Sequence, residues 1–193
     1  MNRANQSPTN RPADTPEGNV PRGRVRFVNT FEPVSPLYRD LLPALEAEGW
    51  DARALVSRAA YRTSGSEDRD MGFAADTVWM PRFLRGTKRW AALWYFLLAP
   101  AALWRGRVDL NVVLTQPPMF YPLAGWISRR KATPYVIHLM DMYPDLPARL
   151  GLLSPTGRLY RWLSRRAMNA YRGAERVVVL GRCMKARLVE KGV

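Results

Sequence analysis

Two short polar segments hold most of the side chains that could do chemistry, and each directly follows a run of apolar residues. Residues 115–118 read TQPP, and residues 141–145 read DMYPD. Asp141 and Asp145 are two carboxylates within one short segment. Such a pair can orient the hydroxyl groups of a substrate or supply a general base. We predict that Asp141 is catalytic, either as the base or as the group that orients a substrate hydroxyl.

The polar side chains around Asp141 are predicted to bind substrate. Thr115 and Gln116 offer a hydroxyl and an amide where the first apolar run ends. A third segment, residues 30–35 (TFEPVS), follows an earlier apolar run and adds a carboxylate and a hydroxyl. The predicted binding residues are Glu32, Ser35, Thr115, Gln116, Tyr143 and Asp145.

Each assignment has a structural alternative. The prolines of TQPP fix φ and can end a strand without any further role. Asp145 is equally well explained as a helix cap, and residues 30–35 can be a plain connection between a strand and a helix. His138 lies inside an apolar run, where a single histidine is more often a packed core residue. Its spacing alone supports no Ser-His-Asp triad.

Common nucleotide-binding patterns are absent from the sequence. No GxGxxG occurs, which argues against the usual dinucleotide site, and no GxxxxGK[ST] occurs, which argues against a P-loop nucleotidase. The chain has one His and one Cys, so a zinc site built from these ligands is disfavoured and no metal is predicted.

The polar segments are placed by alternating strands and helices. Strands are predicted over residues 24–29, 51–57, 77–80, 109–115, 134–140 and 175–180. Helices are predicted from Ser35-Pro36 to Gly49, over 88–104 and 119–130, from Ser154-Pro155 onward, and over 183–191. Each Ser-Pro pair suggests an N-cap followed by proline at the first helical position. The alternation predicts an α/β, Rossmann-like, mostly parallel sheet with helices on both faces. Thr115 and Asp141 should then share one rim of the sheet.

The length of 193 residues fits one domain of ordinary size. Residues 1–22 are rich in Pro, Asn and Thr and lack the apolar segment of a signal peptide. We predict a disordered tail there and a folded domain over residues 23–193. The single Cys183 rules out an internal disulfide and fits a reducing compartment.

The chain is strongly basic, with 30 Lys and Arg against 16 Asp and Glu and a net charge of +14. Such a balance favours anionic lipid headgroups, phosphate-bearing substrates or nucleic acid as partners. Nucleic acid is disfavoured, because the aromatic residues lie mostly in apolar runs instead of alternating with basic ones.

Two segments are candidates for contact with a membrane. Residues 90–104 form an apolar run that is shorter than the roughly 20 residues of a spanning helix and contains Pro100. This run is either a buried helix or an interfacial helix with tryptophans at the headgroup boundary. The arginines of residues 158–172 form either a solvated helix face or a patch for phosphate or lipid headgroups.

Five segments, in this order, resemble family 4 of the GT-B glycosyltransferases, especially bacterial enzymes of surface-polysaccharide and lipid-linked sugar assembly. They are RVRFVNTFEP, ALEAEGWDARALVSR, VDLNVVLTQPPMF, PYVIHLMDMYPDLPARLGLLS and AERVVVLGRCMKARLVEKGV. The resemblance runs from about Arg24 to Val193. Each motif alone would match many unrelated proteins, and the resemblance is specific because all five occur in the family's order and spacing.

The resemblance implies the N-terminal half of a GT-B fold, in which two Rossmann-like domains face each other across a cleft. It implies that this half holds the acceptor, while the C-terminal half holds the nucleotide-sugar donor. It also implies retention of anomeric configuration without a metal or other cofactor. Polyprenyl-linked acceptors are common in the family, so the resemblance implies a cytoplasmic protein held peripherally on the inner face of the plasma membrane.

The sequence departs from the family pattern at two places. The first loop, FEPVSPLYRD, lacks the glycine pair that lets backbone amides approach the donor phosphates. The chain also stops at residues 191–193, where family members enter the link to the donor half. We therefore expect an acceptor-side domain that is inactive without a donor-binding segment or partner chain. The alternative is a non-catalytic, membrane-associated or partner-binding domain derived from a transferase.

Overall fold

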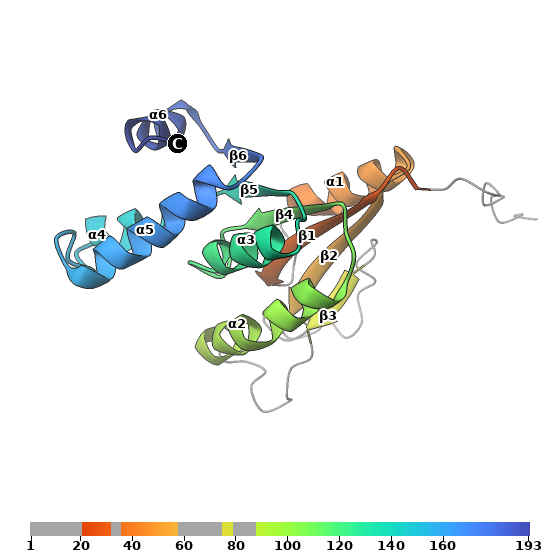
Figure 1. The fold of residues 1–193 in the computed structure, drawn as a ribbon, viewed down its shortest axis with the longest axis horizontal. Helices are drawn as coiled ribbons and strands as arrows, with labels where there is room; N and C mark the ends of the chain where they lie inside the picture. The colour runs from red at the N-terminus through yellow and green to blue at the C-terminus, as the bar shows by residue number, and fades with distance from the viewer. Residues whose placement is uncertain (1–20, 32–35, 58–74, 79–87) are drawn as a thin grey trace, which may run out of the picture.

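A computed structural model describes residues 21–31, 36–57, 75–78 and 88–193 of the chain (Figure 1). The predicted site residues Glu32 and Ser35 lie outside the described residues. So do nearly all of the predicted tail and residues 58–74.

A six-stranded sheet with the order β3-β2-β1-β4-β5-β6 forms the centre of the fold. Its strands are β1 (Arg24–Phe31), β2 (Asp51–Ser57), β3 (Ala75–Val78), β4 (Leu110–Leu114), β5 (Tyr135–Leu139) and β6 (Arg176–Val179). Every pair of neighbouring strands is parallel. The predicted α/β class with a Rossmann-like parallel sheet is therefore confirmed, and each predicted strand is present with slightly different ends.

Helices cover both faces of this sheet. They are α1 (Pro36–Ala47), α2 (Lys88–Arg105), α3 (Tyr121–Arg130), α4 (Asp145–Arg149), α5 (Arg158–Arg172) and α6 (Arg182–Glu190). Helix α2 packs beside α3, and α3 packs beside α5, so these three form one layer (Figure 1).

Two apolar cores show which helices cover which face. Leu42 of α1 packs with Val25 and Phe27 of β1 in one core. Val28 of β1, together with buried residues of α2, α3 and α5, belongs to the other. Alternate residues of a strand point to opposite faces, so α1 lies on one side of the sheet and the layer α2-α3-α5 lies on the other.

The start of α5 differs from the prediction. The helix begins at Arg158 with Gly157 as its N-cap, and not after Ser154. The Gly157 N–H donates to the Ser154 carbonyl at 3.1 Å, so the segment SPTG closes a turn before the helix begins. The prediction was wrong because a Ser-Pro pair also suits a β-turn. The short helix α4 has no counterpart among the predicted elements.

Two basic side chains bind the carbonyl groups at the C-terminal end of α2. Arg26 of β1 is buried and donates to the carbonyls of Ala102 and Leu103 at 3.3 and 3.5 Å. Lys131 donates to the carbonyls of Leu103 and Gly106 at 3.1 and 2.5 Å. The negative end of the helix dipole favours these cations. Burial, with the nearby charges of Arg26 and Arg107, lowers the pKa of Lys131.

Among the described residues, no helix has both the length and the hydropathy needed to cross a bilayer.

Candidate functional site

The carboxyl ends of β4 and β5 lie side by side at one edge of the sheet. Leu114 of β4 is paired with His138 of β5. Just beyond this pair, the Met140 N–H donates to Thr115 Oγ1 at 3.3 Å. The segments TQPP and DMYPD therefore share one rim, as the parallel sheet predicted.

This rim adjoins the point where the strand order reverses. From β1 the chain builds the sheet first through β2 and β3, and then through β4 on the other side of β1. In open α/β sheets, ligands bind in the crevice outside the carboxyl ends of the strands at such a point. Gln116 follows β4, one of the two strands that meet there.

Three of the predicted site residues are accessible from solvent at the rim. Gln116 is exposed, and Asp141 and Tyr143 are partly exposed. Burial raises the pKa of Tyr143, and the charge of Asp141 adds to the rise. The Tyr143 phenol therefore stays protonated near neutral pH and can donate a hydrogen bond beside the Asp141 carboxylate.

Thr115 and Asp145 are held by the protein itself. Thr115 is only 1% exposed, and its hydroxyl is bonded to Met140, so its position favours a role in fixing the two rim segments against each other. Asp145 accepts a hydrogen bond from the Tyr160 hydroxyl at 2.8 Å on Oδ1, and its Oδ2 lies 2.5 Å from Lys191 Nζ. Both carboxylate oxygens of Asp145 are therefore engaged.

The helix-cap explanation of Asp145 is wrong. The N-cap of α4 is Pro144, and Asp145 is the first residue of the helix. Its side chain instead joins three elements, because Tyr160 belongs to α5 and Lys191 directly follows α6. Its negative charge at the N-terminal turn of α4 also suits the helix dipole.

A pair of hydrogen-bonded tyrosines holds the backbone of the DMYPD segment in place. The hydroxyls of Tyr121 (α3) and Tyr171 (α5) lie 2.8 Å apart, and their rings stack with centroids 5.3 Å apart. The Tyr121 hydroxyl also donates to the Tyr143 carbonyl at 2.8 Å. Because Tyr121 has one hydroxyl proton, Tyr171 must be the donor in the bond between the two hydroxyls. Burial raises the pKa of Tyr171 to about 12.

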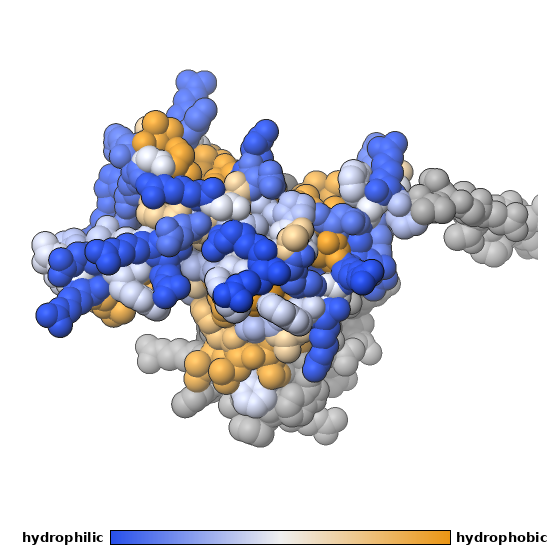
Figure 2. Space-filling view, in the orientation of Figure 1, coloured by the Kyte–Doolittle hydropathy of each residue, from blue (hydrophilic) through white to orange (hydrophobic). Residues whose placement is uncertain are grey.

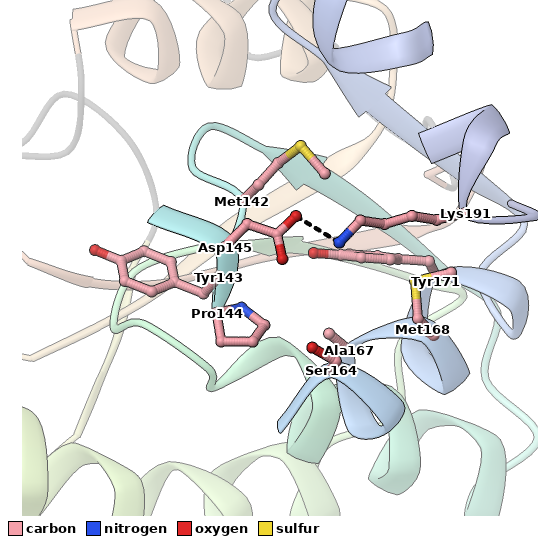
Figure 3. Close-up of a pocket in the computed structure, with 9 residues that line it drawn as sticks. All are labelled: Met142, Tyr143, Pro144, Asp145, Ser164, Ala167, Met168, Tyr171 and Lys191. Carbon is pink, nitrogen blue, oxygen red and sulfur yellow. Dashed lines mark hydrogen bonds and ion pairs between the residues drawn. The ribbon is translucent and has the colours of Figure 1, made fainter. Parts of the chain in front are cut away.

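A small cavity lies behind the segment, between it and α5 (Figure 3). Its volume of about 10 Å³ matches about one water molecule. Ser164 lines it, and its buried Oγ has no hydrogen-bond partner within the described structure. In Figure 3 the Tyr143 ring points away from this cavity, while Asp145 and Lys191 meet beside it. The cavity is thus a packing defect behind the rim and too small for a sugar.

His138 occupies the position of a packed strand residue. It is partly buried in β5, between β4 and β6, and burial lowers its pKa. The interpretation of His138 as a core residue agrees with this position.

Four residues that shape the rim were not singled out by the sequence. They are Tyr121, Tyr160, Tyr171 and Lys191. Tyrosines on the inner faces of predicted helices were one available signal, since a buried hydroxyl usually has a partner. No local spacing connects Lys191 with Asp145.

Comparison with known proteins identifies the family. The model of the family described as "Glycosyl transferase 4-like domain" matches residues 35–193, which is most of the chain. A search of curated proteins found no match.

Two of the solved structures that share the fold come from Phytolacca americana and Thermosynechococcus elongatus. The chain is similar to UGT2 of Phytolacca americana in complex with UDP-2fluoro-glucose and pterostilbene, with 11% identity and a TM-score of 0.51, covering 84% of this chain and 48% of that one. It is also similar to sucrose-phosphate synthase of Thermosynechococcus elongatus, with 12% identity and a TM-score of 0.51, covering 88% and 45%. The chain thus spans about half the length of these solved relatives.

These likenesses support the predicted fold, the N-terminal Rossmann-like half of a GT-B glycosyltransferase, and the match over residues 35–193 decides the family. The chain belongs to the glycosyl transferase 4-like domain family.

Proposed function

We propose that the chain is the acceptor-binding half of a glycosyltransferase that moves a sugar from a nucleotide-sugar to a cell-envelope or lipid-linked acceptor. The observation that carries this proposal is the rim at the ends of β4 and β5, where Gln116, Asp141 and Tyr143 are accessible in a domain of a glycosyltransferase family. The proposed reaction uses the nucleotide-sugar as a substrate and requires neither a metal nor another cofactor.

In the proposed reaction, Asp141 accepts a hydrogen bond from the reacting hydroxyl of the acceptor. The oxygen of that hydroxyl forms a bond to the anomeric carbon, and the bond from this carbon to the phosphate oxygen of the nucleotide breaks. The nucleotide leaves with the electron pair, and the acceptor proton passes to Asp141 as general base. We propose retention of configuration at the anomeric carbon, as the family resemblance implies, which requires the acceptor oxygen to approach from the same face of the sugar that the nucleotide leaves. Gln116 and Tyr143 would hold other polar groups of the acceptor.

The donor is proposed to be bound mainly by a second Rossmann-like half, supplied by another segment or by a partner chain. Support comes from the length of the solved relatives, of which this chain covers 48% and 45%. Glu32 and Ser35 are proposed to add further contacts to the substrate. A lipid-linked acceptor would place the protein peripherally on the inner face of the plasma membrane.

The proposal is tested by binding of acceptor mimics to the whole chain. Saturation-transfer NMR with a panel of short polyprenyl-diphosphate sugars should detect at least one ligand, and nucleotide-sugars should bind more weakly. Asp141→Asn should weaken binding by about tenfold, the effect of losing one charged hydrogen bond. Glu175→Gln is the matched control, because Glu175 is an exposed carboxylate just before β6, at the amino-terminal edge of the sheet and therefore away from the rim.

Equal binding by the Asp141→Asn and Glu175→Gln variants would contradict the assignment of Asp141 as an acceptor-binding residue at the rim. Absence of any sugar ligand, together with retained membrane or protein binding, would favour the alternative of a non-catalytic domain derived from a transferase.

A further inference from the structure

We propose that the outer surface of the helix layer α2-α3-α5 is the face by which the protein binds an anionic lipid bilayer. This surface, called the helix-layer face below, comprises the exposed side chains of α2 (Lys88–Arg105), α3 (Tyr121–Arg130) and α5 (Arg158–Arg172). The inference deepens the proposed function, because it rests on an acceptor held at a membrane and names the surface that meets it.

Helix α2 is apolar on the side that faces solvent as well as on the side that faces the core. Tyr95, Ala99 and Leu103 are buried against the sheet. On the outer side, Leu97 is 62% and Trp104 is 53% exposed, with Leu93 exposed one turn before Leu97. Residues four apart lie on one face of a helix, so these side chains form a continuous stripe. A helix on the surface of a soluble domain usually carries polar residues there. One side of the helix is therefore buried, as a core helix requires, while the other carries exposed apolar side chains that suit an interfacial helix.

The other two helices present exposed tryptophans beside arginines. On α3, the Arg130 guanidinium lies 5.0 Å from the centre of the Trp126 ring. On α5, the Arg166 guanidinium lies 5.5 Å from the Trp162 ring, which is 53% exposed. Tryptophan prefers the headgroup boundary of a bilayer, and arginine pairs with lipid phosphates there. Only the C-terminal half of α5 packs on the core, through Ala167, Ala170 and Tyr171, so Leu159 and Trp162 stay exposed.

Charge on the three helices has a single sign. The sequences of α2, α3 and α5 contain no Asp or Glu. Exposed arginines on them include Arg105, Arg130, Arg158, Arg161, Arg165 and Arg166. The acidic residues of the described segments lie in other elements, for example Asp40 and Glu46 in α1 and Glu190 in α6. Figure 2 shows hydrophilic residues gathered over α3 and α5 and hydrophobic ones over α2.

A bilayer surface explains both the exposed arginines and the exposed apolar side chains of the helix-layer face. Anionic headgroups attract the arginines, and the boundary of the acyl region accepts the Leu and Trp side chains. Nucleic acid could bind the arginines, but it offers no apolar region that would contact the aliphatic stripe with Leu93 and Leu97. A second copy of the chain, with its net charge of +14, would bring two faces of the same sign together.

The face also lies beside the candidate site. Helix α3 starts at Tyr121, shortly after the TQPP segment at the carboxyl edge of the sheet. A protein resting on its helix-layer face would therefore hold the Gln116 and Asp141 rim at the border of the bilayer. The sugar end of a lipid-linked acceptor could then reach the rim while its lipid part stays in the membrane.

The test is co-sedimentation of the whole chain with vesicles of phosphatidylcholine, with and without about a third of phosphatidylglycerol. We expect binding to the anionic vesicles that falls steeply with salt, and little binding to the neutral ones. The double variant Arg158→Glu/Arg165→Glu should weaken binding by more than about tenfold. Arg176→Glu/Arg182→Glu makes the same change of charge on β6 and α6 and should keep most of the binding.

The apolar stripe is tested separately. Leu97→Ser should weaken vesicle binding several-fold, while Leu180→Ser should not, although Leu180 at the end of β6 is 64% exposed and Leu97 is 62% exposed. Circular dichroism confirms that each variant is folded.

Equal losses from the two charge-reversal pairs would overturn the assignment of the face while leaving membrane association intact. No binding to any vesicle, with arginine-dependent binding to single-stranded DNA or RNA, would identify a nucleic-acid surface instead. Because the assay involves no sugar, the acceptor assignment at Asp141 can fail or hold independently of these outcomes.

Discussion

Asp145 Oδ2 and Lys191 Nζ lie 2.5 Å apart, although 46 residues separate them in the chain. The contact joins the loop after β5 to the end of α6, and the Tyr160 hydroxyl on α5 completes it at 2.8 Å from Oδ1. The carboxylate of Asp145 thus connects α5 and the end of α6 to the rim of the candidate site.

Replacing Asp145 should destabilise this junction. Asp145→Ala removes a charged hydrogen bond and an ion pair that is partly exposed on the lysine side, so we expect a loss of about 1–2 kcal/mol in the free energy of unfolding. Urea unfolding measures it. Glu175→Ala, which removes an exposed carboxylate, is the control and should change the free energy by less than about 0.5 kcal/mol. Equal effects of the two variants would contradict the structural role of Asp145.

The tyrosine pair should respond unequally to loss of each hydroxyl. Tyr121→Phe leaves both the Tyr143 carbonyl and the Tyr171 hydroxyl without their partner, so we expect a cost of about 2–3 kcal/mol. Tyr171→Phe removes only a donor to Tyr121 and should cost about 1 kcal/mol. Thermal or urea unfolding of the two variants gives the comparison. A larger cost for Tyr171→Phe would mean that the direction of the hydrogen bonds is the reverse.

Thr115 offers a test of how the two rim segments are joined. Thr115→Val keeps the shape of the side chain but leaves the Met140 N–H without its acceptor, which should cost about 1–2 kcal/mol. Thr115→Ser retains the hydroxyl and should recover most of the loss. Amide hydrogen exchange at Met140 should accelerate in the valine variant and not in the serine variant. Unchanged exchange in both would show that the bond does not restrain the rim.

Gly125 on α3 should not tolerate even a methyl group. A Cβ at this position would lie 2.9 Å from carbon atoms of the Tyr135 ring, which is buried in β5. We expect Gly125→Ala to cost about 1–3 kcal/mol through overpacking. Gly181→Ala is the matched control, since no atom of the described residues beyond its chain neighbours lies within 4 Å of its Cβ position. A neutral Gly125→Ala variant would show that α3 can move away from the sheet.

His138 should make stability depend on pH in mildly acidic solution. Burial lowers its pKa below the ordinary value of 6.5, so the unfolded chain takes up the proton first as the pH falls. Stability is therefore fully present above about pH 6.5 and decreases from there towards the folded pKa, by at most about 1.4 kcal/mol per pH unit. The chain has one His, so His138→Gln should flatten the pH dependence of urea unfolding between pH 7 and 5. An unchanged slope would mean that carboxylates control this range.

The sequence by itself determined the order and type of nearly every element, because the signals for them are local. Alternation of apolar runs predicted the six strands, and a parallel α/β sheet places the residues after β4 and β5 at one edge whatever the details of packing. The common rim of Thr115 and Asp141 followed from that alone. Gly49 marked the end of α1 for a local reason as well, since it adopts φ +85° there and few other residues do so easily.

Only the tertiary structure decided which polar groups at the rim are free and which are engaged. The bonds of Asp145 to Lys191 and of Tyr121 to Tyr171 join residues far apart in the chain, and no short-range pattern encodes them. The same holds for α5, in which Leu159 and Trp162 are exposed while Ala167 and Ala170 are buried. The sheet reaches only its C-terminal half, so Trp162 stays exposed for a reason that lies in the arrangement of the elements and not in the helix itself.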